Sequence, residues 1–115
     1  MKKPIDVINI SVVNNTSGKT ERQTLESGTI IGLSIYDGGI SATGLVQAGL
    51  SCNGDVILPL HSIENYRNRE TEYHNGYIPL PNLDGGKDYA VQIYTDGKFT
   101  ADCNFQAVFV YANEF

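Results

Sequence analysis

Apolar and polar side chains alternate along several short segments of this chain, a pattern that predicts strands with one face in a core. Ile8, Ile10 and Val12, for example, share one face of the first segment. The alternating segments are 5–13, 29–36, 55–60 and 89–94. The last segment, 104–112, is apolar on both faces. We therefore expect it at the centre of a sheet, covered on both sides or facing a neighbouring subunit.

Asp-Gly and Asn-Gly pairs separate these segments. Both residue types suit the tight turns of β-hairpins, because glycine takes positive φ freely and Asn or Asp tolerates it. Turns at such short spacing indicate an antiparallel all-β protein of about eight strands. The five pairs are Asp37-Gly38, Asn53-Gly54, Asn75-Gly76, Asp84-Gly85 and Asp96-Gly97.

Three segments are less regular. Residues 23–26 are compatible with a short strand, and 40–52 alternates well enough to predict a longer one. The polar segment 61–75 has two interpretations. Ile63 and Tyr66 lie three residues apart, as in one or two helical turns, but a long irregular loop fits equally well.

The length of 115 residues is that of a single domain, 1–115, with enough chain to bury a core. Two facing antiparallel sheets, a β-sandwich, accommodate about eight short strands best. Jelly-roll connectivity is our preferred topology, and an immunoglobulin-like Greek key is the alternative. Two cysteines, Cys52 and Cys103, are too few for a disulfide framework; a single bridge between strands is the alternative to the two buried thiols that we expect.

Charge and hydropathy exclude several classes of partner. The net charge is −5 and the basic residues are scattered, which argues against nucleic acid as a main partner. No apolar run approaches the roughly 18 residues of a membrane span. Polar residues interrupt the segment after Met1, so it does not resemble the core of a signal peptide. We expect the protein to be made in the cytoplasm and kept or assembled there.

Motifs for catalysis or cofactor binding are absent from the sequence. Ser17-Gly18-Lys19-Thr20 lacks the earlier glycine of a phosphate-binding loop. His61 and His74 flank several glutamates, but their spacing is not that of a metal site on one element, and a solvated loop with internal ion pairs explains them better. We therefore expect no enzyme activity, no cofactor and no metal.

Tyrosines gather in and beside the polar segment, next to the proline-containing tract 77–81. Prolines lack a donor for the sheet ladder, which predicts an edge or sheet-switching segment. Tyrosine suits partly wet interfaces, although these rings could instead cover the open end of the sandwich. The predicted interface residues are Tyr66, Arg67, Arg69, Tyr73, Tyr77, Ile78, Pro79 and Leu80.

Three tracts, Ile5–Val12, Val56–Leu60 and Phe105–Tyr111, resemble small jelly-roll proteins of virus particles. Penton and minor capsid subunits of tailless icosahedral phages are the nearest group. The resemblance covers most of the chain but rests on pattern and length, and it carries over no functional residue. It implies a non-enzymatic subunit that forms homo-oligomers, contacts other capsid proteins, assembles in the host cytoplasm and ends in the virion.

Our leading hypothesis is therefore a structural assembly protein, such as a small penton, minor or decoration subunit of a phage capsid. The alternative is a small carbohydrate-binding β-sandwich, in which Tyr66, Tyr73 and Tyr77 stack on sugar rings. An enzyme of unknown class is a third hypothesis that no motif supports.

Overall fold

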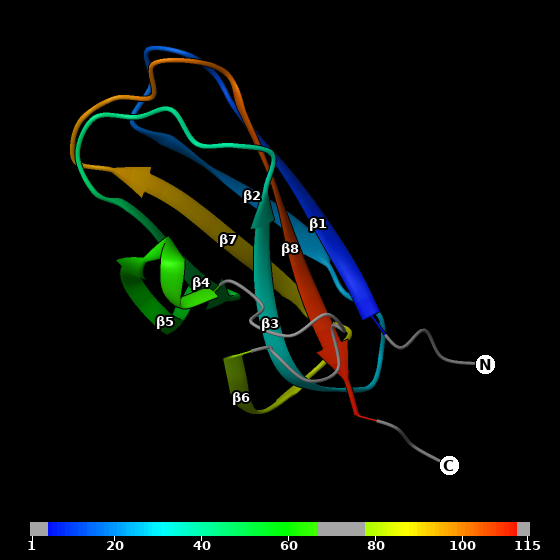
Figure 1. Cartoon of the computed structure of the whole chain (residues 1–115). Helices are drawn as coiled ribbons and strands as arrows, with labels where there is room; N and C mark the ends of the chain where they lie inside the picture. Colours follow the sequence, from blue (N-terminus) through cyan, green and yellow to red (C-terminus); the bar gives the residue numbers. More distant parts are fainter. Residues whose placement is uncertain (1–4, 67–77, 113–115) are drawn as a thin grey trace.

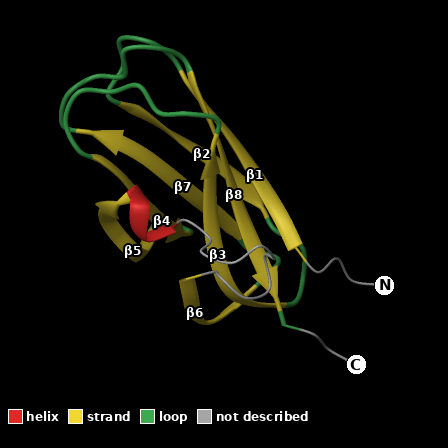
Figure 2. Cartoon of the chain, in the orientation of Figure 1, coloured by secondary structure: helices red, strands yellow, loops and turns green. Residues whose placement is uncertain are grey.

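The computed structural model describes residues 5–66 and 78–112, and in this part of the chain the protein is all-β. Figure 2 shows strands connected by loops, with one short turn of helix. The elements are β1 Ile5–Val12, β2 Gly18–Thr24, β3 Thr29–Asp37, β4 Val46–Cys52, β5 Asp55–Ser62, η1 Ile63–Tyr66, β6 Ile78–Asp84, β7 Asp88–Thr95 and β8 Cys103–Tyr111.

The strands form two four-stranded antiparallel sheets, ordered β1-β8-β3-β6 and β2-β7-β4-β5. The sheets lie one against the other as two layers (Figure 1). The predicted antiparallel β-sandwich is thus confirmed. The expectation for the last segment is also met, because β8 pairs with β1 on one side and β3 on the other.

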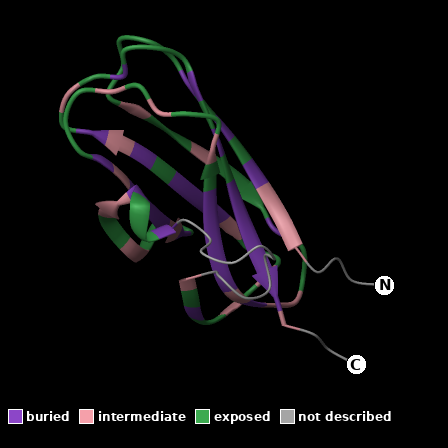
Figure 3. Ribbon diagram, in the orientation of Figure 1, coloured by how far each residue is buried: buried purple, intermediate pink, exposed green. Residues whose placement is uncertain are grey.

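The core lies between the two layers and draws on both. Ile8, Ile10 and Val12 are almost fully buried, as the alternation predicts. Across the core, the ring of Tyr89 on β7 meets that of Phe109 on β8, with centroids 6.1 Å apart. Figure 3 shows β8 buried along most of its length, whereas burial alternates over the second half of β1. The apolar contacts between layers are the main stabilising term of such a fold.

One predicted turn closes a hairpin. Asn53 and Gly54 join β4 to β5 with φ values of 50° and 91°. Both central residues therefore have the positive φ that a type I′ turn requires.

Two other Asp-Gly pairs lie at turns but close no hairpin, so the hairpin expectation is wrong for them. Asp84-Gly85 leads from β6 to β7 and Asp96-Gly97 from β7 towards β8, and in both cases the two strands belong to different sheets. An Asp-Gly pair favours a reversal of the chain direction, but it does not decide which sheet the next strand joins. That depends on which faces of the strands are buried. Asp37-Gly38 ends β3 as predicted, and Asn75-Gly76 lies outside the described residues.

Two strand boundaries differ from the prediction. The strand expected over 40–52 begins only at Val46, because side chains bind the backbone before it. The Thr95 hydroxyl donates to the Thr43 carbonyl at 2.6 Å, and Asp96 Oδ1 accepts from the Leu45 N–H at 3.0 Å. These bonds replace a sheet ladder with a loop.

The short strand expected over 23–26 is instead β2, Gly18–Thr24. Its sequence is polar and shows no apolar alternation, since it is an edge strand that only β7 pairs with. The ladder with β7, rather than its own pattern, defines this strand.

Of the two interpretations of the polar segment, the helical one holds for Ile63–Tyr66, whereas His61 and Ser62 before it still belong to β5. A single turn of 3₁₀ helix, Ile63–Tyr66, buries both of its terminal side chains, which eclipse each other at i and i+3. β6, with Pro79 and Pro81, lies at a sheet edge as expected. Cys52 and Cys103 are both buried free thiols, in agreement with the prediction.

Candidate functional site

The predicted interface residues fall into two groups. Arg67, Arg69, Tyr73 and Tyr77 lie outside the described residues. The others are Tyr66, Ile78, Pro79 and Leu80, and among them only Pro79 is exposed. The predicted interface therefore has one fully exposed side chain within the described part of the chain.

Tyr66 lies in the core rather than at a surface. Its exposed fraction is 0%, and its hydroxyl donates to the Ala48 carbonyl at 2.9 Å. Its ring stacks on His61 with centroids 4.6 Å apart. Burial also raises the pKa of the Tyr66 hydroxyl well above its ordinary value. Leu80 is likewise buried at 6%. In this arrangement neither side chain is available to a partner.

Two exposed apolar side chains lie together on β5, whereas the other exposed large apolar side chains of the described residues, Val13, Tyr36 and Leu45, lie on other segments. Val56 is 71% exposed and Leu60 is 37% exposed, while Leu58 is half-buried against the core. Pro59 between them is exposed too. We call Val56, Leu58, Pro59 and Leu60 the β5 ridge. Figure 3 shows no fully buried residue along this strand.

The ridge stands beside a hollow on the outer face of the β2-β7-β4-β5 sheet. β4 and β5 pair with register shifts on either side of Leu50, so β5 bends away from regular pairing. Gly49 is close to the ridge, because a Cβ there would lie 3.1 Å from the Leu58 carbonyl oxygen and 3.4 Å from Leu60 Cδ2. The hollow has a volume of about 530 Å³.

The other edge strands carry features that discourage association. β2 is polar, and its Lys19 Nζ and Glu21 Oε1 form an ion pair at 2.8 Å. β6 carries two prolines, and β1 presents Asn9 and Ser11 outward. Charges and prolines on an edge limit uncontrolled strand addition. Of the described edges, only β5 combines an unpaired side with an apolar ridge.

His61, at the end of β5, is the histidine of this region. His61 Nδ1 lies 2.8 Å from the Pro59 carbonyl oxygen and 3.4 Å from the Tyr66 hydroxyl, which are contacts that orient the ring. Within residues 5–66 and 78–112, no three His, Cys, Asp or Glu side chains are grouped as metal ligands would be. His74, the other predicted flank of the polar segment, lies outside the described residues.

No helix among the described residues has the length and apolar character needed to cross a membrane. Comparison with known proteins gives no matching protein-family model, no curated protein with significant sequence similarity and no solved structure with significant structural similarity. The physical character of the surfaces is therefore the basis for a functional assignment.

Proposed function

We propose that this chain is a non-enzymatic jelly-roll subunit that acts through protein–protein contacts, most simply as a small capsid protein of a phage particle. The observation that carries the proposal is the β5 ridge, an exposed apolar strip on an edge strand. Exposed apolar groups at an edge are typical of a surface that another protein covers.

Strand connectivity supports the jelly-roll part of the proposal. Strand pairs are nested, β1 with β8, β2 with β7, β3 with β6 and β4 with β5. This is the pairing of one long antiparallel hairpin, with its tip at Asn53-Gly54, rolled into two layers. An immunoglobulin-like sandwich keeps its first two strands in one sheet. Here β1 and β2 lie in different sheets, which favours the jelly roll.

The exposure of the ridge side chains also sets how much free energy their burial by a partner would contribute to association. Full burial of an exposed Val or Leu side chain contributes about 1.5–3 kcal/mol. Val56 is 71% exposed, so its burial by a partner contributes about 1–2 kcal/mol, or roughly five- to thirtyfold in an association constant.

The partners are then other copies of this chain and neighbouring capsid proteins, and the place of action is the virion, after assembly in the host cytoplasm. The jelly-roll connectivity and the apolar edge support this assignment together with the resemblance of Ile5–Val12, Val56–Leu60 and Phe105–Tyr111 to capsid subunits. A gene neighbourhood that encodes capsid or packaging proteins would support it further. A neighbourhood of sugar-degrading enzymes would contradict it.

Light scattering of the purified chain over a wide concentration range tests the proposal. We expect the mass to rise above that of one chain at high concentration, and Val56→Glu to return it to the monomer. Val13→Glu is the matched control, since Val13 is 60% exposed but lies outside the ridge. A wild-type chain that stays monomeric at high concentration, or equal loss of assembly in both variants, would contradict the proposal.

A further inference from the structure

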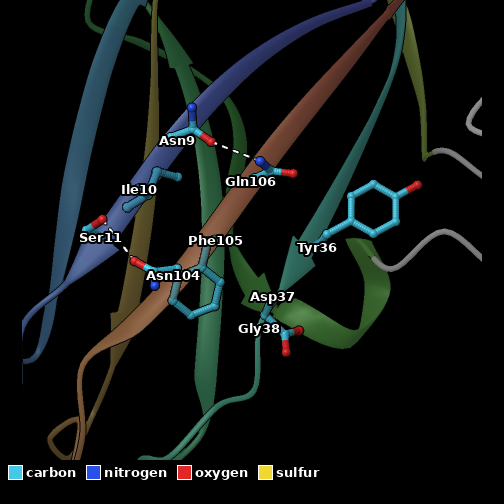
Figure 4. Close-up of a pocket in the computed structure, with 9 residues that line it drawn as sticks. All are labelled: Asn9, Ile10, Ser11, Tyr36, Asp37, Gly38, Asn104, Phe105 and Gln106. Carbon is cyan, nitrogen blue, oxygen red and sulfur yellow. Dashed lines mark hydrogen bonds between the residues drawn. The ribbon is translucent and has the colours of Figure 1, made fainter.

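A second hollow lies on the opposite side of the sandwich, on the outer face of the β1-β8-β3-β6 sheet. Its volume is about 480 Å³, within the range of small-molecule sites. Figure 4 shows its lining, in which amide and hydroxyl side chains from β1 and β8 lie beside Tyr36 of β3. Because it faces away from the β5 ridge, a subunit that docks through β5 leaves this face open.

Sheet register aligns these side chains in two rungs. In the first, Asn9 on β1, Gln106 on β8 and Tyr36 on β3 are direct neighbours across the strands. Gln106 Nε2 donates to Asn9 Oδ1 at 3.1 Å. This bond fixes both amides and leaves the Asn9 amide N–H groups and the Gln106 carbonyl oxygen directed at the surface.

The second rung lies one step along the same face. Ser11 Oγ donates to Asn104 Oδ1 at 3.0 Å, so the Asn104 amide N–H groups are available for a ligand. Gly38 comes next, and its N–H donates to the Asn104 carbonyl at 3.2 Å. Apart from its two chain neighbours, no residue has an atom within 4 Å of where a Gly38 Cβ would be, so the absent side chain leaves open space at this end of the hollow.

We propose that this hollow binds a neutral saccharide, with Asn9, Asn104 and Gln106 as hydrogen-bonding groups and Tyr36 as the ring on which a sugar stacks. Sugar hydroxyl groups donate and accept at once, and neighbouring amide N–H and C=O groups match them. Tyr36 is 39% exposed and offers a wide apolar face for the C–H groups of a sugar ring.

The charge of the lining selects a neutral ligand. Asp37 is its single charged side chain among the described residues, and Asp37 Oδ1 accepts from the Gly39 N–H at 3.0 Å. No Lys, Arg or His is among the described residues that line the hollow, so this lining offers no cationic side chain to a phosphate, sulfate or carboxylate group. β8 beneath the hollow is paired with strands on both sides, so an extended peptide has no ladder to join over it; among the described strands, β1 is unpaired on its outer side, and β3 pairs with β6 only as far as Leu33.

Nuclear magnetic resonance titration tests the site directly. The isotope-labelled full chain is titrated with neutral hexasaccharides of glucose, mannose, galactose or xylose, and with sialylated and sulfated oligosaccharides for comparison. We expect millimolar or tighter binding of a neutral sugar, with the largest shifts at Asn9, Tyr36 and Gln106. Binding of none of these neutral sugars, binding of acidic sugars alone, or shifts confined to another face would overturn the proposal.

Three variants locate the contact groups. Gln106→Ala removes one hydrogen-bonding group and is expected to weaken binding roughly fivefold. Tyr36→Ala removes the stacking ring and is expected to weaken it at least about tenfold. Gly38→Leu fills the open space without altering any contact group, so it should abolish binding.

Gln92→Ala is the matched control, because Gln92 is an exposed amide of β7 in the other sheet. It should bind sugar as the wild type does, and thermal melting of each variant separates lost binding from lost folding. Sugar binding that survives Gly38→Leu in a folded chain would refute the site. Sugar titration tests the saccharide site and light scattering tests subunit assembly, so the two results are independent. Absence of sugar binding leaves the assembly proposal unaffected, and absence of assembly leaves the saccharide proposal unaffected.

Discussion

Replacement of Tyr66 by phenylalanine separates a core role from an interface role. The variant removes only the hydroxyl, which is fully buried and donates to the Ala48 carbonyl at 2.9 Å. A buried carbonyl that loses its donor costs about 1–2 kcal/mol in the free energy of unfolding. For 115 residues, an unfolding entropy of about 240 cal/mol/K converts this loss into a fall in Tm of about 4–8 °C.

Thermal and urea unfolding, followed by circular dichroism, measure the effect, and light scattering measures association in parallel. We expect Tyr66→Phe to lower stability with unchanged association. Tyr36→Phe is the control, since Tyr36 is 39% exposed and its stability change should stay within about 0.5 kcal/mol. Unchanged stability combined with weaker association in Tyr66→Phe would refute the core placement and restore the interface role that the sequence suggested.

Three further predictions concern pH, backbone and thiols. Burial raises the pKa of Tyr89 to about 12 and also raises that of Tyr111, whereas unfolded tyrosine ionises near 10. The contribution of these two hydroxyl groups to stability in urea should therefore be constant below about pH 10 and fall above it. Stability that rises with pH above about pH 10 would contradict the burial of these two hydroxyl groups. Gly54→Ala should lower stability by about 1–2 kcal/mol in chemical unfolding, because φ is 91°, while Gly38→Ala, in open space, should change it little. The two buried thiols should react with a thiol reagent only as fast as the chain unfolds, and rapid reaction of the native protein would show that they are accessible.

The sequence predicts the strands best where a core enforces alternation. Ile8, Ile10 and Val12 identify β1 because each second side chain must enter the core. β2 lacks that signal, since an edge strand paired with β7 alone presents mostly polar side chains. Alternation also overextends β4, where Thr43 and Asp96 hold the preceding backbone in a loop. Hydrogen-bond partners that are this far apart in the chain produce no local pattern in the sequence.

The candidate surfaces were less predictable than the strands. The alternation of Val56, Leu58 and Leu60 is visible in the sequence, but it does not say that β5 is an edge strand with its ridge exposed. Tyrosines in a polar segment indicate an interface, yet Tyr66 of η1 is held in the core by a hydrogen bond to Ala48 on β4.

The polar hollow illustrates the same limit. Asn9 and Gln106 form its central hydrogen bond although they are 97 residues apart in the chain. Such a pair becomes adjacent only when β1 and β8 lie side by side in a defined register. A one-residue shift of either strand would direct these amides into the core, so the site depends on register as well as on residue types.

Hydrogen exchange at low and high protein concentration tests most directly whether β5 is the assembly surface. If β5 is that surface, exchange of the β5 amides, 55–62, slows as concentration rises, while exchange of the other edge strand of the same sheet, β2, stays unchanged. Equal exchange of β5 at both concentrations, or slowing confined to β2, would contradict it.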